Sequence, residues 1–424
     1  MVTIRLARAP DLPSLLSLLG RIDATRAPLH PTLLRAWVGV FGPSEASSRS
    51  FSALCGVATV AFIYMIGREV AGRRAGLWSA WLSAISPPLV QYSRETRMYA
   101  LLAMLTCAAW WRLLRFRRGA SAGGQWVLGA LLAAIGYTHP LGPPMIAVLG
   151  LGYLIDRKNS QLSFGRWGAI QVLVGFALWP WLGHYLDHPP ESTVGVLPIR
   201  FLLGLPIGYV GGNFAALGVC GLVAAWGMRG SDRRTSMILL SWLTVVPTSL
   251  YLYSRLGHPI FGPARYTLFV GPAYLLVLGV GLARLPGWAR WPLAVAGASL
   301  AWPLLATTCY APGLKADWRL LSRALRGEAR VIRLARPDPS NDAELETARY
   351  YLPPAVAVRV AAEAEAGRVE PLGDGEWLVV CGRDGPRPAA RYDGGSAVER
   401  VDLTFPGLRC TLYARIGTPP IAGP

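Results

Sequence analysis

Arginine, tyrosine and other polar side chains gather beside the ends of long apolar segments. Residues 91–99 read Gln-Tyr-Ser-Arg-Glu-Thr-Arg-Met-Tyr, so that Arg97 and Tyr99 precede an apolar stretch. Arg265 and Tyr266 stand in the same position before another apolar stretch. Arginine stays charged and binds phosphate through two parallel hydrogen bonds. Such pairs are suited to holding a phosphate group whose hydrocarbon tail stays in a membrane.

Side chains that could move a proton are few in these clusters. Residues 23–31 include Asp23 and His30, and Glu95 lies between two arginines. A carboxylate beside an acceptor hydroxyl can take its proton or orient it. A weaker cluster holds His139 next to a proline, where the imidazole could simply bond carbonyls freed by a helix break.

Each of these residues also has a plainer interpretation. Tyrosine and arginine accumulate as anchors where helices leave a membrane, and Glu95 can form a local ion pair with its neighbours. What favours a binding site is convergence, because several arginine-bearing clusters fall on the same side of the predicted helices. That side follows from the arrangement of the apolar segments.

The elements that must position these residues are membrane helices. The chain has 424 residues, 53% of them hydrophobic and only 16% charged, which excludes an ordinary soluble protein. Crossing a bilayer takes about 20 apolar residues. The sequence predicts ten such segments, near residues 51–67, 75–92, 98–114, 125–139, 143–155, 166–185, 208–228, 235–253, 266–284 and 290–309.

The positive charge is distributed unevenly between the two sides of these segments. Residues 1–309 hold 26 basic and 9 acidic residues, whereas residues 310–424 hold 16 and 15. Fifteen of the positive charges fall in the loops after the odd-numbered segments, which the positive-inside rule places in the cytoplasm. The net charge of +18 is therefore mainly a signal of topology, and no nucleic-acid partner is expected.

The chain divides into three predicted regions. Residues 1–50 form an extracytoplasmic loop with short juxtamembrane helices, residues 51–309 form the membrane domain, and residues 310–424 form a small α/β domain. Ten crossings place both ends outside the cell, although residues 1–50 contain no segment that could carry them there. Either the natural chain begins upstream of Met1 with a first membrane helix, which we expect, or the number of crossings differs by one.

The region from Tyr310 contains both helix-like and strand-like patterns of apolar residues. Trp318–Leu325 and Ala343–Leu352 are predicted helices. Predicted strands cover Val331–Leu334, Trp377–Cys381, Val401–Phe405 and Thr411–Ile416. Cys381 and Cys410 could pair if this region lies in an oxidising compartment, but spacing alone does not establish the geometry.

Five motifs in order give the chain a family resemblance. They are His30-Pro31, Phe41-Gly42-Pro43-Ser44-Glu45 with Arg49, Ser86-Pro87 through Tyr99, Pro263-Ala264-Arg265-Tyr266 and Ala316-Asp317-Trp318-Arg319. Together they resemble the GT-C membrane glycosyltransferases of the dolichyl-phosphate-mannose–protein mannosyltransferase-like group (glycosyltransferase family 39), which includes the lipid A aminoarabinose transferases. The resemblance implies a mainly α polytopic fold.

The resemblance also implies a function. It is the transfer of a sugar from a polyprenyl-phosphate carrier to an extracytoplasmic acceptor, either a protein, lipopolysaccharide or another glycolipid, at the inner (plasma) membrane. On this basis Arg265 and Tyr266 bind the donor phosphate with help from His30, while Arg97 and Tyr99 shape the site. No cofactor is required, although some relatives use a divalent cation.

Two departures from the family pattern concern the reaction. Thr32 replaces the second proline of the His-Pro-Pro motif, which is a mild change. The catalytic Asp-Glu pair of the family follows a first membrane helix, and neither is present in this sequence. Asp23 and Glu95 are the remaining candidates for the catalytic carboxylate, and we expect the family pair to lie upstream of Met1.

Two other function classes stay open at this point. A transporter or lipid flippase would favour inverted repeats and polar residues near the middle of the membrane, neither of which the sequence displays. A catalytically degenerate scaffold derived from the same family is the second alternative, because the expected carboxylate pair is missing. Release of sugar from a labelled carrier separates an enzyme from both alternatives.

Overall fold

The computed structural model describes the helical part of the chain almost continuously and the strands of the C-terminal part. The described residues are 2–22, 27–119, 123–187, 199, 202, 206, 208–256, 268–310, 331–335, 351, 357–361, 376–382, 398–405 and 408–415. Two compact units result, one formed by Leu6–Cys309 and the other by Tyr310–Pro424 together with Met1–Arg5.

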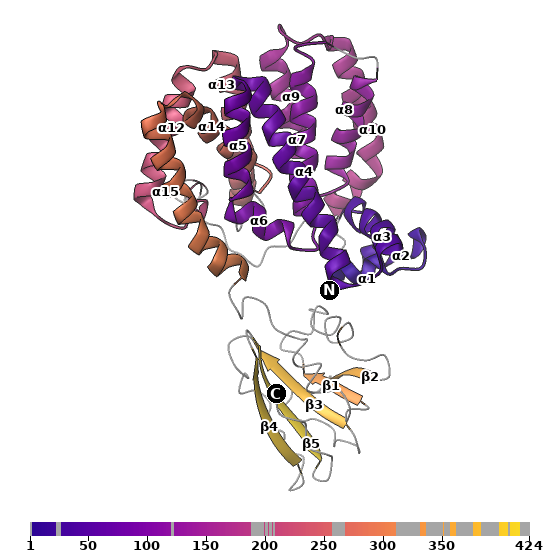
Figure 1. Ribbon diagram of the computed structural model, residues 1–424. Helices are drawn as coiled ribbons and strands as arrows, with labels where there is room; N and C mark the ends of the chain where they lie inside the picture. Colours follow the sequence, from indigo (N-terminus) through magenta and orange to yellow (C-terminus); the bar gives the residue numbers. More distant parts are fainter. Residues whose placement is uncertain are drawn as a thin grey trace. The chain divides into compact units, whose positions relative to one another are not determined.

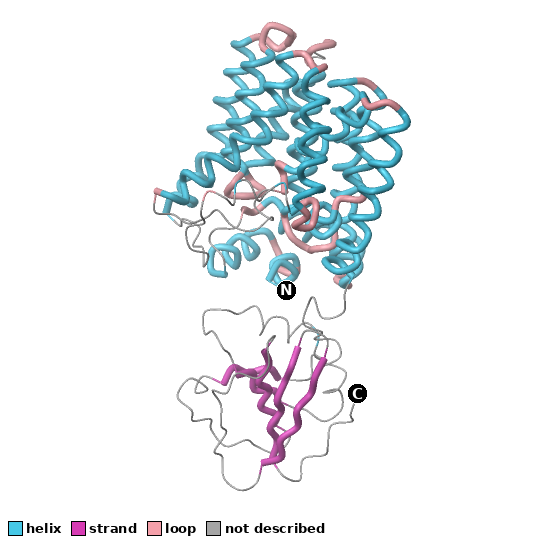
Figure 2. Tube along the Cα trace, turned by 90° about the vertical axis from the view of Figure 1, so that its left-hand side faces the viewer, coloured by secondary structure: helices cyan, strands magenta, loops and turns pink. Residues whose placement is uncertain are grey.

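Helices make up the larger unit, and the long ones run side by side in one bundle (Figure 1 and Figure 2). In chain order they are α1 Val2–Ala7, α2 Leu12–Ile22, α3 Leu29–Phe41, α4 Glu45–Ala71, α5 Arg73–Ala84, α6 Pro87–Ser93, α7 Tyr99–Arg115, α8 Gly124–Gly136, α9 Gly142–Asp156, α10 Phe164–Asp187, α12 Phe214–Arg229, α13 Arg233–Arg255, α14 Gly271–Arg284 and α15 Gly287–Leu305.

Each predicted membrane segment contains a helix, but their lengths differ. Among the described residues, three helices are long and apolar enough to cross a membrane: Glu45–Ala71, Arg233–Arg255 and Gly287–Cys309. Four shorter apolar helices are α8, α9, α12 and α14. Side chains on the outside of the bundle are also apolar: Phe176 and Trp179 of α10 are 75% and 73% exposed. Such a surface suits lipid and not water.

The predicted segment 75–92 is not one helix. It is divided into α5 and α6, and α6 lies across the end of the bundle (Figure 1). Ser86 is extended, and Pro87 and Pro88 follow it at the first positions of α6. Proline has no N–H to donate and disfavours a helical residue before it, so the break falls here.

Small residues let the helices approach closely. A Cβ atom on Gly67 of α4 would lie 2.8 Å from the Cα of Gly76 in α5, and one on Gly281 of α14 would lie 2.2 Å from the carbonyl oxygen of Val223 in α12. Membrane helices lack a hydrophobic drive to associate in lipid, so backbone contact of this kind provides much of their packing. At the α4–α5 turn, Gly72 adopts φ +89°, which favours glycine.

The centre of the bundle is formed by α7 and α14, which bury most of their side chains. Trp110 of α7 stacks on Trp242 of α13 with ring centroids 5.0 Å apart. Trp242 also donates from its indole N–H to the carbonyl of Phe269 at 3.0 Å. The core therefore joins helices that are far apart in the sequence.

Buried carboxylates hold part of the arginine-rich end of the bundle. Glu69 at the end of α4 pairs with Arg118 at 2.8 Å and with Arg115 at 3.5 Å, and its own side chain is 4% exposed. Asp156 at the end of α9 pairs with Arg117 at 2.5 Å. Some of the loop arginines counted above therefore have a structural role as well as a topological one.

The smaller unit contains a five-stranded sheet in the order β2-β1-β3-β5-β4. The strands are β1 Val331–Ala335, β2 Ala357–Ala361, β3 Glu376–Gly382, β4 Val398–Phe405 and β5 Leu408–Arg415. β1 runs parallel to β2 and β3, whereas β5 runs antiparallel to β3 and β4.

The four predicted strands correspond to β1, β3, β4 and β5, and β2 was not predicted. β2 reads Ala-Val-Arg-Val-Ala, which is short and carries a charge at its centre, so its pattern is weak. The predicted helix Trp318–Leu325 lies outside the described residues, as does Ala343–Leu352 apart from Tyr351.

Candidate functional site

The start of α4 is built by the motif that contains Ser44, Glu45 and Arg49. Ser44 is the N-cap, and its hydroxyl oxygen accepts a hydrogen bond from the N–H of Ser47 at 3.1 Å. Glu45 in the first turn forms an ion pair with Arg49. A hydroxyl cap and an acidic first turn both stabilise a helix start. Arg49 is therefore held by its own helix.

His30 lies on α3, which packs against this part of α4. Its side chain is 2% exposed, and its ring lies 5.8 Å from that of Phe51. Trp37 of α3 fixes the two helices by donating to the carbonyl of Ser47 at 3.0 Å. The imidazole of His30 therefore projects from α3 and contacts Phe51 of α4.

The loop between α6 and α7 carries Glu95 and Arg97. Both are partly exposed, and the N–H of Arg97 donates to the carbonyl of Glu95 at 2.7 Å. The Arg97 guanidinium lies 5.4 Å from the centre of the Tyr99 ring, within the range of a cation–π contact. Tyr92 at the end of α6 also contacts Tyr99, with ring centroids 5.4 Å apart.

His139 in the α8–α9 loop completes this cluster. It is 4% exposed, its ring lies 5.6 Å from that of Tyr99, and its Nδ1 accepts a hydrogen bond from the N–H of Leu141 at 3.0 Å. The same loop reaches α3, because the N–H of Leu29 donates to the carbonyl of Tyr137 at 2.9 Å.

Contacts around Tyr99 join two of the predicted residues, Arg97 and Tyr99, to His139 and Tyr92. A third, His30, is tied to the same region through the backbone, because its neighbour Leu29 donates to Tyr137 beside the loop that holds His139. Glu95 belongs to the same α6–α7 loop. The other three predicted residues lie outside the described part of the chain: Asp23, Arg265 and Tyr266.

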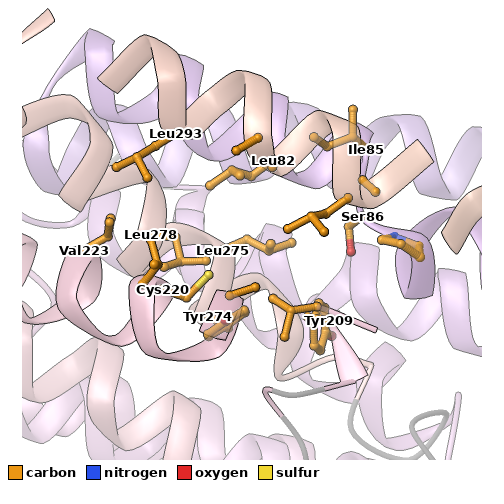
Figure 3. Close-up of a pocket in the computed structure, with 18 of the residues that line it drawn as sticks. Leu82, Ile85, Ser86, Tyr209, Cys220, Val223, Tyr274, Leu275, Leu278 and Leu293 are labelled. Atoms are coloured by element: carbon orange, nitrogen blue, oxygen red, sulfur yellow. The ribbon is translucent and has the colours of Figure 1, made fainter. Parts of the chain in front are cut away.

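An apolar cavity of about 230 Å³ opens between α5, α12, α14 and α15 (Figure 3). Leucines from these helices point into it, among them Leu82, Leu278 and Leu293. Ser86 and Pro87 form part of its wall, and α6 begins at Pro87. The helix that starts at this cavity ends at Ser93, one residue after Tyr92 of the polar cluster.

Two tyrosines lie between this cavity and a second one. Tyr209 and Tyr274 line both, with their rings 5.4 Å apart, and the second cavity measures about 280 Å³. The arrangement can accommodate an apolar chain next to a site for a polar head group.

The sequence indicates some of these residues only weakly. His139 stands beside Pro140, which favours the plainer role, and its contact with Tyr99 needs the fold to bring the α8–α9 loop to α7. Tyr209 and Tyr274 carried no signal at all, since neither belongs to a polar cluster in the sequence. Within the described residues, no group of three or more His, Cys, Asp or Glu side chains could hold a metal ion.

Comparison with known proteins gives a consistent result. Residues 25–183 match the family described as dolichyl-phosphate-mannose-protein mannosyltransferase. This segment contains His30, Glu95, Arg97, Tyr99 and His139. No curated protein sequence matches the chain.

Solved structures resemble nearly the whole chain at low sequence identity. ArnT from Cupriavidus metallidurans in the apo state is 14% identical with a TM-score of 0.62, and the match covers 97% of this chain and 93% of that one. The same protein bound to undecaprenyl phosphate is 15% identical with a TM-score of 0.60, covering 95% and 89%.

A third structure extends the similarity to another glycosyltransferase. Arabinofuranosyltransferase AftD from Mycobacteria is 16% identical with a TM-score of 0.52, covering 91% of this chain and 35% of that one. The family match falls on the helices that build the polar cluster, and the fold similarity extends over the remaining helices. Residues 25–183 are thus similar to the dolichyl-phosphate-mannose-protein mannosyltransferase family, and the chain shares the fold of ArnT and of arabinofuranosyltransferase AftD.

Proposed function

We propose that the protein transfers a sugar from a polyprenyl-phosphate carrier to an acceptor on the extracytoplasmic side of the inner membrane. The observation that carries this proposal is the family match over residues 25–183, because it covers the segment whose polar side chains meet around Tyr99. The acceptor is a protein or a glycan, and the transferred unit is a hexose or a pentose. All ten predicted segments cross the membrane, and the C-terminal sheet lies outside.

The apolar cavity suits the isoprenoid tail of such a donor. Its walls are mainly apolar, so they offer an isoprenoid tail van der Waals contacts like those of the surrounding lipid. The ArnT structure with a similar fold binds undecaprenyl phosphate, a lipid of this class. A tail seated in this cavity directs the phosphate along α6 toward the polar cluster.

The polar residues have different roles in this reaction. Arg265 and Tyr266 bind the donor phosphate and His30 assists them, while Arg97 and Tyr99 shape the pocket for the sugar. The acceptor oxygen attacks the anomeric carbon as the bond to the phosphate oxygen breaks. A positive group stabilises the charge that develops on the leaving phosphate, and Glu95 or Asp23 receives the acceptor proton.

Membranes that contain the protein test the proposal with a labelled polyprenyl-phosphate sugar. We expect label to leave the carrier and appear on an acceptor fraction. Arg265→Ala should raise the KM for the donor at least tenfold, since a charged phosphate contact is lost. Arg255→Ala is the matched control, because it removes an exposed arginine that ends α13.

Each result has a clear meaning. Retention of all label on the carrier contradicts the enzyme and favours the scaffold, whereas movement of the intact donor across the membrane favours the flippase. An unchanged donor KM in the Arg265→Ala variant would return that residue to an anchoring role.

The catalytic carboxylate is tested by Glu95→Gln and Asp23→Asn, which keep the shape of each side chain. General base catalysis contributes about 10²–10⁴-fold, so the variant that lacks the base should lose that much in kcat with little change in donor KM. If both variants keep the wild-type kcat, neither residue is the base.

The cofactor requirement forms part of the same proposal. We propose that transfer proceeds without a resident cofactor, with a divalent cation as the alternative. Activity that survives treatment with a chelator supports the first, and activity that is lost and then restored by a divalent metal supports the second.

A further inference from the structure

Two cysteines occupy matching positions on neighbouring strands of the sheet. β3 and β5 are antiparallel, and their register places Cys381 directly opposite Cys410. These are the only cysteines in residues 310–424, since the other four of the six lie at positions 55, 107, 220 and 309. The register thus brings together two cysteines that are 29 positions apart in the sequence.

The backbone geometry of such a pair is suited to a covalent link. Residues directly opposite on antiparallel strands have Cα atoms about 4.5 or 5.5 Å apart, depending on whether the pair exchanges hydrogen bonds. Disulfides span Cα separations of about 4.4–6.8 Å, so both kinds of pair fall within the range. Opposite residues also project from the same face of a sheet.

We propose that Cys381 and Cys410 form a disulfide that closes the C-terminal sheet. The register between β1 and β3 ends at Ala335 and Val380, one position before Cys381. Among the described residues, Cys381 is thus paired with β5 and lies just past the last β1–β3 pair. A bond there ties β3 to the β4–β5 pair.

Formation of the bond is an oxidation that needs a partner. The two thiols lose two protons and two electrons, and an oxidant that carries a reactive disulfide takes them up to become a dithiol. Such oxidants act in extracytoplasmic compartments, whereas the cytosol keeps thiols reduced. The proposal therefore rests on the outward placement of the sheet in the proposed function.

The wild-type full-length protein is sufficient for the test. Membranes are dissolved in denaturant with a first alkylating reagent, which blocks every free thiol, and are then reduced and treated with a second reagent of different mass. We expect Cys381 and Cys410 to carry only the second label and Cys55 and Cys107 only the first. Before reduction, peptides with Cys381 and Cys410 should be found linked, with a mass two hydrogens below their sum.

Substitutions make the pairing specific. Cys381→Ser should move Cys410 to the first label, and Cys410→Ser should do the same for Cys381, whereas Cys220→Ser should change neither. First-label modification of both cysteines in the wild type, or a link from either to another cysteine, would overturn the proposal.

Transfer activity in the same membranes separates this proposal from the proposed function. Active protein with free thiols at both positions rejects the disulfide and leaves the transferase. Linked peptides in an inactive protein support the disulfide and count against the transferase.

Discussion

His139 illustrates how one side chain serves both the backbone and the candidate site. Its Nδ1 accepts the hydrogen bond from Leu141 N–H, which fixes the turn into α9, and its ring contacts that of Tyr99. An imidazole held in this way can place an aromatic ring without contacting any substrate itself. Its effect on transfer is therefore expected to pass through Tyr99.

Replacing His139 by Ala should lower both stability and activity. The substitution leaves the buried N–H of Leu141 without its acceptor, and such a loss costs about 1–3 kcal/mol. Asn offers an oxygen near the position of Nδ1, so His139→Asn is the matched variant and should recover part of the loss. Thermal unfolding in detergent measures the difference. Equal stability of the Ala variant and the wild type would contradict this role.

Asp232 makes a comparable bond at the start of α13, outside the membrane segments. It is the N-cap, and its Oδ1 accepts from the N–H of Thr235 at 3.0 Å. Burial alone would raise the pKa of this carboxyl, but hydrogen bonding to Thr235 and the charge of Arg117 together hold the pKa below its ordinary value of 3.8. The ionised form is thus the one that the fold favours.

Asp232→Ala should destabilise the protein by about 1 kcal/mol at neutral pH, the usual cost of a lost cap. Because the pKa is lower in the folded state, the benefit of the charge is complete above about pH 4 and disappears as the pH falls below 3.8. Asp232→Asn keeps the cap but not the charge. Its deficit against the wild type should shrink over that acidic range, as unfolding curves at pH 7 and pH 3.5 would reveal.

At the scale of elements, the length of each apolar segment predicts that a helix is present, but it predicts less well where that helix begins and ends. Every apolar segment contains a helix because burial of apolar side chains and internal backbone bonding both demand one in lipid. The division of segment 75–92 was missed because Pro87 and Pro88 are themselves compatible with an apolar run. β2 was missed because a strand of five residues depends on its neighbours more than on its own pattern.

The candidate site was predictable only where its residues are neighbours in sequence. Arg97 and Tyr99 form part of one motif, and His30 begins another. Contacts such as His139 with Tyr99 depend on which helix ends the bundle brings together. Tyr274 lies on α14 and Tyr209 precedes α12, and no local pattern reveals that the fold brings both to the cavities.

The packing of α12 on α14 depends on Gly281. A methyl group there would meet the Val223 carbonyl at 2.2 Å, so Gly281→Ala must push two helices apart. Overpacking of this kind costs about 1–3 kcal/mol. Gly221→Ala is the control on α12, because nothing lies within 4 Å of its added methyl. We expect a lower unfolding temperature for the first variant only, together with weaker use of the lipid donor since both helices line the apolar cavity.

At the scale of the whole molecule, the distribution of positive charge predicts the orientation of the chain in the membrane. Fifteen positive charges lie in the loops after odd-numbered segments, and at this end Glu69 and Asp156 neutralise a few of them in buried pairs. The remaining exposed charges are the ones that oppose transfer across the membrane. The orientation can be tested without any substitution, because the chain has only two lysines.

Lys158 follows α9 in a loop predicted to be cytoplasmic and is exposed, whereas Lys315 lies beyond α15 in the region predicted to be outside. An amine reagent that cannot cross membranes should therefore label Lys315 in intact spheroplasts and leave Lys158 unmodified. Opening the membranes should add label at Lys158, which controls for its reactivity. The reverse pattern would invert the topology, place the C-terminal sheet in the reducing compartment and remove the basis for the disulfide. Label on both lysines in sealed spheroplasts would mean that the number of crossings between them is even, not odd as predicted.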